Sequence, residues 1–376
     1  MSQVGVIFGG PSPEHDVSVL TGLQAARELA GSLGHTVRAL YWSKSGEWFE
    51  VDPGLEARDF LDAVPSHSIP LRLVLGTDGR GFYPASRRLR RATPLSLDAV
   101  VVCCHGGPGE DGTLQASLDL VGMAYTGPSL AGAGLGMDKL AFHGVMTAAG
   151  LPTLPRVLLE EHTKEVGFSG PFIVKPRFGG SSIGIQVVED LDTARIVRRS
   201  NVHLGAGAVV EPYRGDLFDL QIAVRNWPSL ELSAIERPLR TARAGGAAEP
   251  EFLGYADKYV GGEGMASAPR ELPARISSSL ERSIRTLAEE VARLVGVRGI
   301  ARIDFLSDGE DLLVNEINTI PGSLARYLWI DPPRSFATLL ADLLEEARQS
   351  PTHRYDAAGA DGSVLRGASS IAAKLA

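Results

Sequence analysis

The sequence predicts an α/β protein that becomes α+β in its C-terminal part, and three observations support this fold class. Apolar runs at 4–8 and 35–42 enclose a segment with helical spacing, which is how a parallel α/β domain begins. Near the other end, apolar runs at 300–306 and 311–318 flank a Ser-Asp-Gly-Glu turn, the pattern of a β-hairpin. The chain has 376 residues, too many for one compact core, so we expect two or three domains.

The first domain is predicted from alternating strand and helix patterns. A Pro/Ser/Gly loop that carries Glu14 follows the first strand, and helical spacing then runs from Val17 to a stop at Gly34. A buried strand at 97–104 ends in two adjacent cysteines, which we interpret as core because neighbouring strand residues point to opposite faces. The stretch 46–91 has an irregular pattern with an arginine cluster at 87–91, which we expect to be a solvated surface, with phosphate binding as the alternative. Loops at the carboxyl ends of the parallel strands form the predicted functional edge.

The composition limits the classes of partner. A net charge of -8 and a pI of about 5.6 argue against nucleic acid or an anionic membrane as partner. The first residues lack a basic segment followed by a long apolar one, and no apolar run approaches membrane-spanning length. We therefore expect a cytoplasmic protein.

The middle of the chain has the pattern of a phosphate-binding loop. A strand at 172–175 ends in Lys175, and a Gly/Ser turn with Ser181 and Ser182 leads into a strand at 185–188. Backbone N–H groups and hydroxyls in such a turn donate to phosphate oxygens, with the lysine beside them. The G-x-x-x-x-G-K-[ST] pattern does not occur, so the phosphate site is not a P-loop, and the loop that carries Glu14 lacks the G-x-G-x-x-G spacing of the dinucleotide fingerprint.

Four further elements complete the prediction. The run 205–211 is typical of a strand, and 237–252 is rich in Arg, Ala and Gly and is expected to be a surface loop. From residue 273, apolar spacings of three and four predict an amphipathic core helix that ends at Gly296. A last helix is expected at 336–347.

The predicted hairpin carries a candidate metal site. Asp304 lies on its first strand, and Glu316 and Asn318 lie two apart on the second, so these last two side chains leave the same face. Two carboxylates and an amide oxygen suit Mg²⁺, which completes its shell with water and phosphate oxygens. A solvated acidic hairpin is the alternative, and the apolar residues around Asp304 and Glu316 weigh against it because an unpaired buried charge is costly. Arg302 offers a bidentate fork to a carboxylate or a phosphate.

Several motifs resemble one family. The run RIDF...NEINTIPG resembles the metal-binding hairpin of ATP-grasp enzymes, and in detail that of the D-alanine-D-alanine ligase family. The segment HGGPGEDG at 105–112 resembles the family's HGxxGEDG motif, with Glu110 and Asp111 expected to orient the ring of His105. Lys175-Pro with GSSIG resembles its phosphate loop, and YADKY at 255–259 its closing loop. The resemblance extends from residue 4 to about 347.

This resemblance implies a three-domain ATP-grasp architecture with the nucleotide between the central and C-terminal domains. The implied segments are an N-terminal α/β substrate-binding domain at 1–127, a central ATP-grasp subdomain at 128–214, a C-terminal subdomain with the lid loop and hairpin at 215–350, and a flexible tail at 351–376. The family also implies a homodimer.

The resemblance also assigns nucleotide and metal contacts. Asp304, Glu316 and Asn318 would bind two Mg²⁺ ions, with Mn²⁺ as an alternative. Asp219 would hold the ribose hydroxyls, with Asp216 as the other candidate for that contact. The remaining implied ATP contacts are Lys139, Lys175, Ser182, Glu211, Tyr213 and Lys258.

The implied reaction is ligation of a carboxylate to an amine. The carboxylate of a D-amino acid, most simply D-alanine, attacks the γ-phosphoryl group to give an acyl phosphate, and an amine then displaces phosphate. Glu14, Ser181 and Tyr259 would hold the first substrate and close the lid, and Arg302 with the Gly322 N–H would form the oxyanion site. The implied substrate contacts are His105, Tyr327 and Leu328.

The sequence departs from the family after NTIPG. The family continues M-T-x-x-S-L, whereas Tyr327 replaces the serine here and Arg326 precedes it. A tyrosine hydroxyl still donates a hydrogen bond, but its ring occupies more of the pocket. A cell-wall D-alanine-D-alanine ligase is the first hypothesis. A related ligase that joins other amino acids or loads a carrier is the second, a non-catalytic nucleotide-binding protein is the third, and a depsipeptide-forming variant ranks below the dipeptide enzymes.

Overall fold

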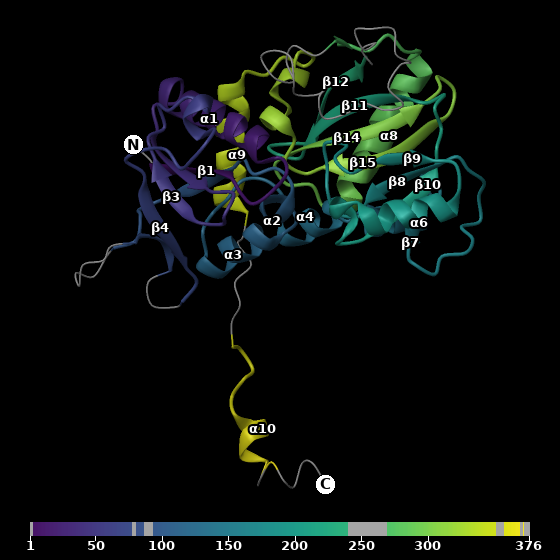
Figure 1. Ribbon diagram of the computed structural model, residues 1–376. Coiled ribbons are helices and arrows are strands. Elements are labelled where there is room, and N and C mark those ends of the chain that lie inside the picture. Colours follow the sequence, from purple (N-terminus) through teal and green to yellow (C-terminus); the bar gives the residue numbers. More distant parts are fainter. Residues whose placement is uncertain are drawn as a thin grey trace.

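A computed structural model describes residues 3–76, 80–85, 93–239, 269–350, 357–368 and 371. Three β-sheets, each with its own hydrophobic core, follow one another along the chain (Figure 1). This mixed α/β architecture confirms the predicted fold class. No helix in the described ranges is long and apolar enough to cross a membrane.

The first sheet has six strands in the order β5-β4-β3-β2-β1-β6. Strand β1 pairs in parallel with β2 and β6, as predicted, whereas β3, β4 and β5 extend the sheet antiparallel. No strand was expected in the irregular pattern of 46–91, yet three short strands there continue the sheet, whereas the arginine cluster at 87–91 lies outside the described residues. The strands are β1 (Gln3–Gly9), β2 (Thr36–Trp42), β3 (Trp48–Val51), β4 (Ile69–Val74), β5 (Gly81–Pro84) and β6 (Ala99–Val102).

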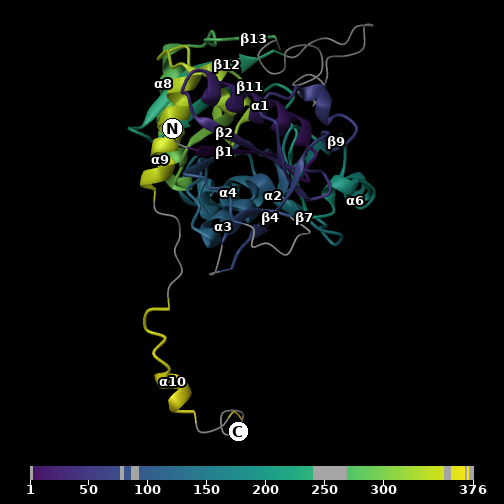
Figure 2. The ribbon, with the colours of Figure 1, turned by 90° about the vertical axis from the view of Figure 1, so that its left-hand side faces the viewer.

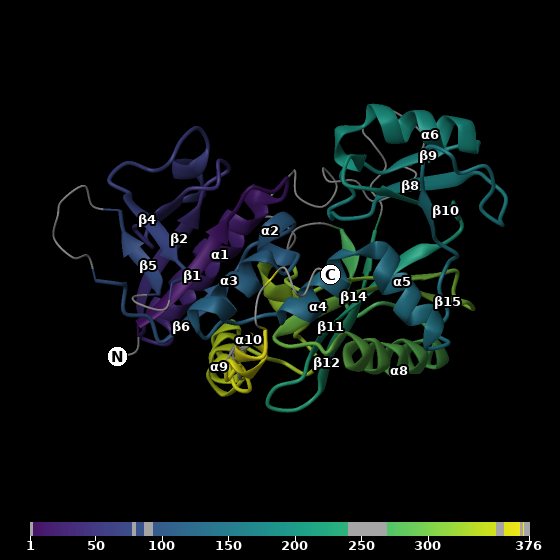
Figure 3. The same cartoon turned by 90° about the horizontal axis from the view of Figure 1, so that it is seen from below.

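Helices from both ends of the chain close the core of this sheet. Helix α1 (His15–Gly31) packs on β1 and β2, and α9 (Phe336–Gln349) packs on β6 and α1 (Figure 3). Four leucines of α9 are buried in the same core as Val4 and Phe8. The remaining elements of this part are η1 (Ala57–Phe60), α2 (Gly107–Glu110), α3 (Thr113–Val121) and α4 (Leu130–Met137).

The second sheet is antiparallel and has the order β7-β10-β8-β9. It carries the predicted phosphate loop between β8 and β9, and α6 covers one of its faces (Figure 2). Its elements, with the preceding helix, are α5 (Lys139–Ala148), β7 (Val157–Leu159), β8 (Phe172–Pro176), β9 (Gln186–Val188), α6 (Leu191–Ser200), η2 (Val202–Leu204) and β10 (Ala208–Pro212).

The third sheet has the order β13-β12-β11-β14-β15, and α8 covers one of its faces. Helix α8 (Ser278–Val295) buries an apolar stripe that includes Ile284 and Val291, and it ends at Gly296 in the left-handed conformation, as predicted. Arg237 and Pro238 belong to a strand, so the predicted surface loop is wrong for these two; residues 240–252 lie outside the described ranges. The strands are β11 (Phe218–Arg225), β12 (Glu231–Pro238), β13 (Arg270–Glu271), β14 (Ile300–Ser307) and β15 (Leu312–Asn318).

The predicted hairpin is formed by β14 and β15. Its register places Asp304 opposite Glu316 and Arg302 opposite Asn318, with an irregularity after Asp304. The 3₁₀ segment η4 (Gly322–Leu328) follows, and α10 (Ser363–Arg366) has no buried residue. The flexible tail and the domain boundaries stay predictions.

Candidate active site

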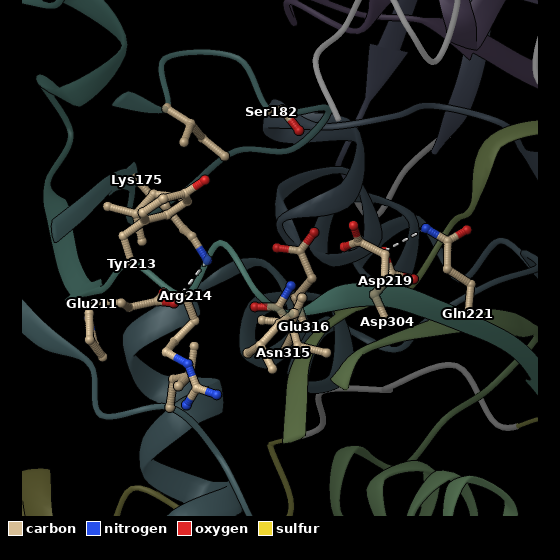
Figure 4. A pocket seen from close by; sticks show the side chains of 16 residues that line it. Lys175, Ser182, Glu211, Tyr213, Arg214, Asp219, Gln221, Asp304, Asn315 and Glu316 are labelled. Atoms are coloured by element: carbon tan, nitrogen blue, oxygen red, sulfur yellow. Dashed lines mark hydrogen bonds and ion pairs between the residues drawn. The ribbon is translucent and has the colours of Figure 1, made fainter. Parts of the chain in front are cut away.

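A cleft lies between the second and third sheets and brings together side chains from both (Figure 4). Lys175 and Glu211 come from β8 and β10, while Asp304 and Glu316 come from the hairpin. The sequence-predicted residues that line the cleft are Lys175, Ser182, Glu211, Tyr213, Asp219, Asp304 and Glu316.

The hairpin gathers the three predicted metal ligands. Asn318 Nδ2 donates to Asp304 Oδ2 at 3.2 Å, and Glu316 lies directly opposite Asp304. Arg302 donates to both oxygens of Asp304, at 2.7 and 2.8 Å, and Lys139 Nζ lies 3.2 Å from Glu316 Oε2. Both carboxylates thus already have a cationic neighbour.

The donor set fits Mg²⁺ only in company with a nucleotide. The described residues contain no group of three or more His, Cys, Asp or Glu side chains that could hold a metal. Two carboxylates and an amide oxygen leave room for the phosphate oxygens and waters that Mg²⁺ normally retains.

The phosphate loop contacts Lys139 and the first domain. Lys139, at the start of α5, donates to the Gly179 carbonyl, and Asp138 caps the same helix by accepting from two backbone N–H groups. Ser181 and Ser182 have positive φ angles of 52° and 59°, which are uncommon for residues other than glycine. Ser181 donates a hydrogen bond to Glu14 Oε1, so two of the residues expected at the first substrate lie in contact.

Glu14 lies at a second hollow, between the first domain and the phosphate loop. A Cβ atom at Gly106 would lie 2.4 Å from Glu14 Oε2, and one at Gly180 would lie 3.0 Å from it. Only glycine at 106 allows this approach without displacing the carboxylate.

His105 is held by groups other than those expected. Its Nδ1 donates to the Ile320 carbonyl at 2.7 Å, so Nε2 is the acceptor for the Thr21 hydroxyl at 2.8 Å. The expectation that Glu110 and Asp111 orient this ring is wrong, because no hydrogen bond joins either side chain to the ring. Burial lowers the pKa of His105 to about 4, against the hydrogen bond to Ile320, and the ring is neutral.

Glu110 instead joins two loops of the backbone. Its carboxylate accepts from the N–H groups of Gly106 and Ile320, at 2.9 and 2.8 Å. Burial, followed by the charge of Glu14, raises its pKa to about 7. Glu110 and His105 therefore attach the first domain to the segment that carries Gly322.

Glu211 is buried and fully ionised. Burial alone would raise its pKa, but Arg156 and Lys175 outweigh that effect and lower the value to about 2. Arg156 Nε donates to one oxygen at 2.7 Å and Lys175 Nζ to the other at 2.9 Å. Arg156 carries no motif of its own, and sequence reasoning missed it.

Two acidic residues were candidates for the ribose contact. Asp219 lines the cleft, whereas Asp216 does not and instead pairs with Arg214 at 2.6 Å. The structure favours Asp219 by position, and the contact itself stays a prediction.

Tyr327, which replaces the serine of the family motif, lies in a polar cluster with Arg270 and Glu236. Arg270 stacks 4.8 Å from the Tyr327 ring centroid and pairs with Glu236 at 2.9 Å. Tyr327 stands beside Glu236, but neither its hydroxyl nor Glu236 Oε2 has a well-formed hydrogen bond to any described residue. Burial raises the pKa of both groups, although Arg270 opposes the change at Glu236.

The other predicted substrate and lid residues are placed as follows. Leu328 is fully buried in the core beneath the first sheet. Gly322 opens η4, in which the next three residues have φ angles near 50°. Lys258 and Tyr259 lie outside the described residues. The catalytic and binding roles of all these residues stay predictions.

Comparison with known proteins gives the same family at both ends of the chain. A model described as the D-ala D-ala ligase N-terminus matches residues 3–128, and one described as the D-ala D-ala ligase C-terminus matches residues 133–345. The D-alanine--D-alanine ligase of Thermoanaerobacter sp. (strain X514) is 31% identical over 379 residues, 93% of this chain and 97% of that protein. That of Mycobacterium bovis (strain BCG / Pasteur 1173P2) is 32% identical over 364 residues, 92% and 95% respectively.

Solved structures agree with the fold. The VanG D-Ala:D-Ser ligase from Enterococcus faecalis aligns with a TM-score of 0.73 at 24% identity, over 92% of this chain and 99% of that one. The D-alanine-D-alanine ligase from Coxiella burnetii aligns with a TM-score of 0.72 at 23% identity, over 92% and 94%. The three sheets and the cleft between the second and third define a ligase of the ATP-grasp class. More narrowly, the chain belongs to the D-alanine-D-alanine ligase family.

Proposed function

We propose that this protein joins two D-alanine molecules into D-alanyl-D-alanine at the expense of ATP, as a cytoplasmic step of peptidoglycan synthesis. The observation that carries the proposal is the cleft itself, where Lys175 of β8, the buried Glu211 and the hairpin carboxylates face one space. We further propose two bound Mg²⁺ ions and a homodimer, as in the family.

In the first half-reaction, one D-alanine carboxylate oxygen attacks the γ-phosphorus of ATP and ADP leaves. Glu14 would hold the ammonium group of this D-alanine, and the Ser181 contact sets the position of the Glu14 carboxylate. Lys139 and Lys175 would bind the phosphate groups of ATP. Bound Mg²⁺ would neutralise charge on the transferring oxygens, held by Asp304, Glu316 and Asn318.

In the second half-reaction, the amine of another D-alanine attacks the acyl phosphate carbonyl. The carbonyl oxygen gains negative charge, which Arg302 and the Gly322 N–H would stabilise, and inorganic phosphate then leaves as the peptide bond forms. His105 and Glu110 fix the segment that carries Gly322 by bonding both the carbonyl and the N–H of Ile320.

A second candidate function is ligation of D-alanine to a different amine. The observation that favours it is the cluster of Tyr327, Glu236 and Arg270, which places an aromatic ring and a buried carboxylate near Arg302. A bulkier ring in the amine pocket changes which side chain fits there.

Phosphate release from ATP and Mg²⁺ tests the two functions. The enzyme is incubated with single D- and L-amino acids and with pairs, and the products are identified by mass. D-alanine alone giving its dipeptide supports the first function. No phosphate release with D-alanine alone, but release with D-alanine and another amine, supports the second function. ATP binding without phosphate release under any condition contradicts both functions.

A further inference from the structure

Arg156 connects three elements around the cleft. It precedes β7, and only 3% of its side chain is exposed. Its Nε donates to Glu211 Oε1 at 2.7 Å, its Nη1 to the Lys139 carbonyl at 2.8 Å, and its Nη2 to the Asn315 carbonyl at 3.2 Å. Each nitrogen atom thus reaches a different element: β10, the start of α5 and β15.

The three partners of Arg156 belong to, or lie next to, residues with three different expected roles: binding the base, the phosphates and the metal. The family resemblance implies that Glu211 meets the amino group of the adenine, and the proposal adopts this contact. Lys139 carries the phosphate-directed ammonium group, which is 3.2 Å from Glu316, and Asn315 is the residue before Glu316. A planar guanidinium can hold three acceptors in fixed directions, whereas an ammonium group is a compact point charge.

The ionisation of Glu211 affects which purine base can bind at this end of the cleft. Arg156 and Lys175 each occupy one oxygen of Glu211, and the carboxylate is held ionised, so it only accepts hydrogen bonds. An ionised acceptor favours a purine that presents an amino group there, and it repels one that presents a carbonyl oxygen.

We propose that Arg156 is a positioning residue for the nucleotide, which aims Glu211 at the exocyclic amino group of the purine and fixes the backbone of Lys139 and Asn315 relative to it. This inference rests on the proposed use of ATP. It concerns nucleotide binding, so it is tested without dipeptide formation.

The experiment measures binding of non-hydrolysable ATP and GTP analogues with Mg²⁺ by calorimetry for the wild type, R156K and R156M. Hydrogen bonds to charged groups contribute enough that we expect R156M to bind the ATP analogue about 10- to 100-fold more weakly. We expect a smaller loss in R156K, which retains the charge. The preference for the ATP analogue over the GTP analogue is expected to fall by about 10-fold in R156M.

Arg195→Met is the matched control. Arg195 is an arginine of the same domain that donates to the Thr163 carbonyl and pairs with Asp192, away from the cleft. Equal base preference in R156M, R156K and the wild type would overturn the inference, and so would an equal loss in R195M. If R156M does not fold, R156K alone is compared with the wild type. Unchanged affinity for the ATP analogue and unchanged preference over the GTP analogue refute the positioning role. Weaker affinity with a reduced preference supports it. If the wild type binds the ATP analogue but makes no dipeptide, the proposed function is contradicted and the inference about Arg156 is not.

Discussion

Replacing Glu110 by glutamine is expected to change the pH dependence of stability. Burial, followed by the charge of Glu14, raises the pKa of Glu110 from 4.5 to about 7, so the folded protein retains a proton that the unfolded chain releases. The stabilisation from this proton is complete below pH 4.5 and is lost as the pH rises through 7. It amounts to about 3 kcal/mol.

His105 contributes with the opposite sign. Burial lowers its pKa from 6.5 to about 4, so the folded protein resists protonation of the ring. Its contribution is complete above pH 6.5 and is lost as the pH falls toward 4. In the wild type the two effects largely cancel between pH 4.5 and 6.5, and Glu110→Gln leaves His105 uncompensated.

The assay is the melting temperature of the wild type and E110Q at intervals between pH 4.5 and 8. The difference, E110Q minus wild type, is expected to rise with pH by about 5 °C across this range. The offset at one pH carries no information, because an amide beside two N–H donors is itself unfavourable. Glu345→Gln, an exposed carboxylate on α9, is the control with no expected trend. Parallel melting curves for E110Q and the wild type would refute the reasoning.

Three further predictions concern the cleft and the fold. Gly180→Ala would place a Cβ atom 3.0 Å from Glu14 Oε2, and we expect the KM for the first D-alanine to rise about 10-fold in steady-state kinetics, with Gly144→Ala, which meets nothing within 4 Å, unaffected. Equal KM values in both variants would count against the role of Glu14. Chelation of divalent ions is expected to abolish turnover, and Asn318→Ala to raise the Mg²⁺ concentration for half-maximal activity about 10-fold; an unchanged Mg²⁺ titration would contradict the ligand assignment. Ser277→Ala removes the N-cap of α8 and should lower the free energy of unfolding by about 1 kcal/mol with normal kinetics, whereas lost activity at full stability would be unexpected.

The hairpin and α8 were predictable because their signals are local. A turn between two apolar runs fixes the pairing of Asp304 with Glu316, and spacings of three and four fix the buried face of α8. The strands β3, β4 and β5 were not predicted, since they are short and only partly buried, so no alternation stands out in 46–91.

Contacts between residues far apart in the sequence explain which parts of the site could not be predicted. Arg156 matters because it meets residues 17, 55 and 159 positions away, and nothing near it in the sequence indicates those partners. The surroundings of His105 were mispredicted for the same reason: its partners, Thr21 and Ile320, are 84 and 215 positions away.

The packing of α9 on the first sheet has a consequence for synthesis of the chain. Strand β6 ends at Val102, and the four leucines that cover it arrive only with α9, which begins at Phe336. At translation rates of about 5 to 20 residues per second, the first sheet waits roughly 10 to 50 s for that cover. During this interval the part of the first sheet that α9 covers lacks that cover. A chain that stops before α9 would leave it uncovered, so the C-terminal helix completes the core that the first strands begin.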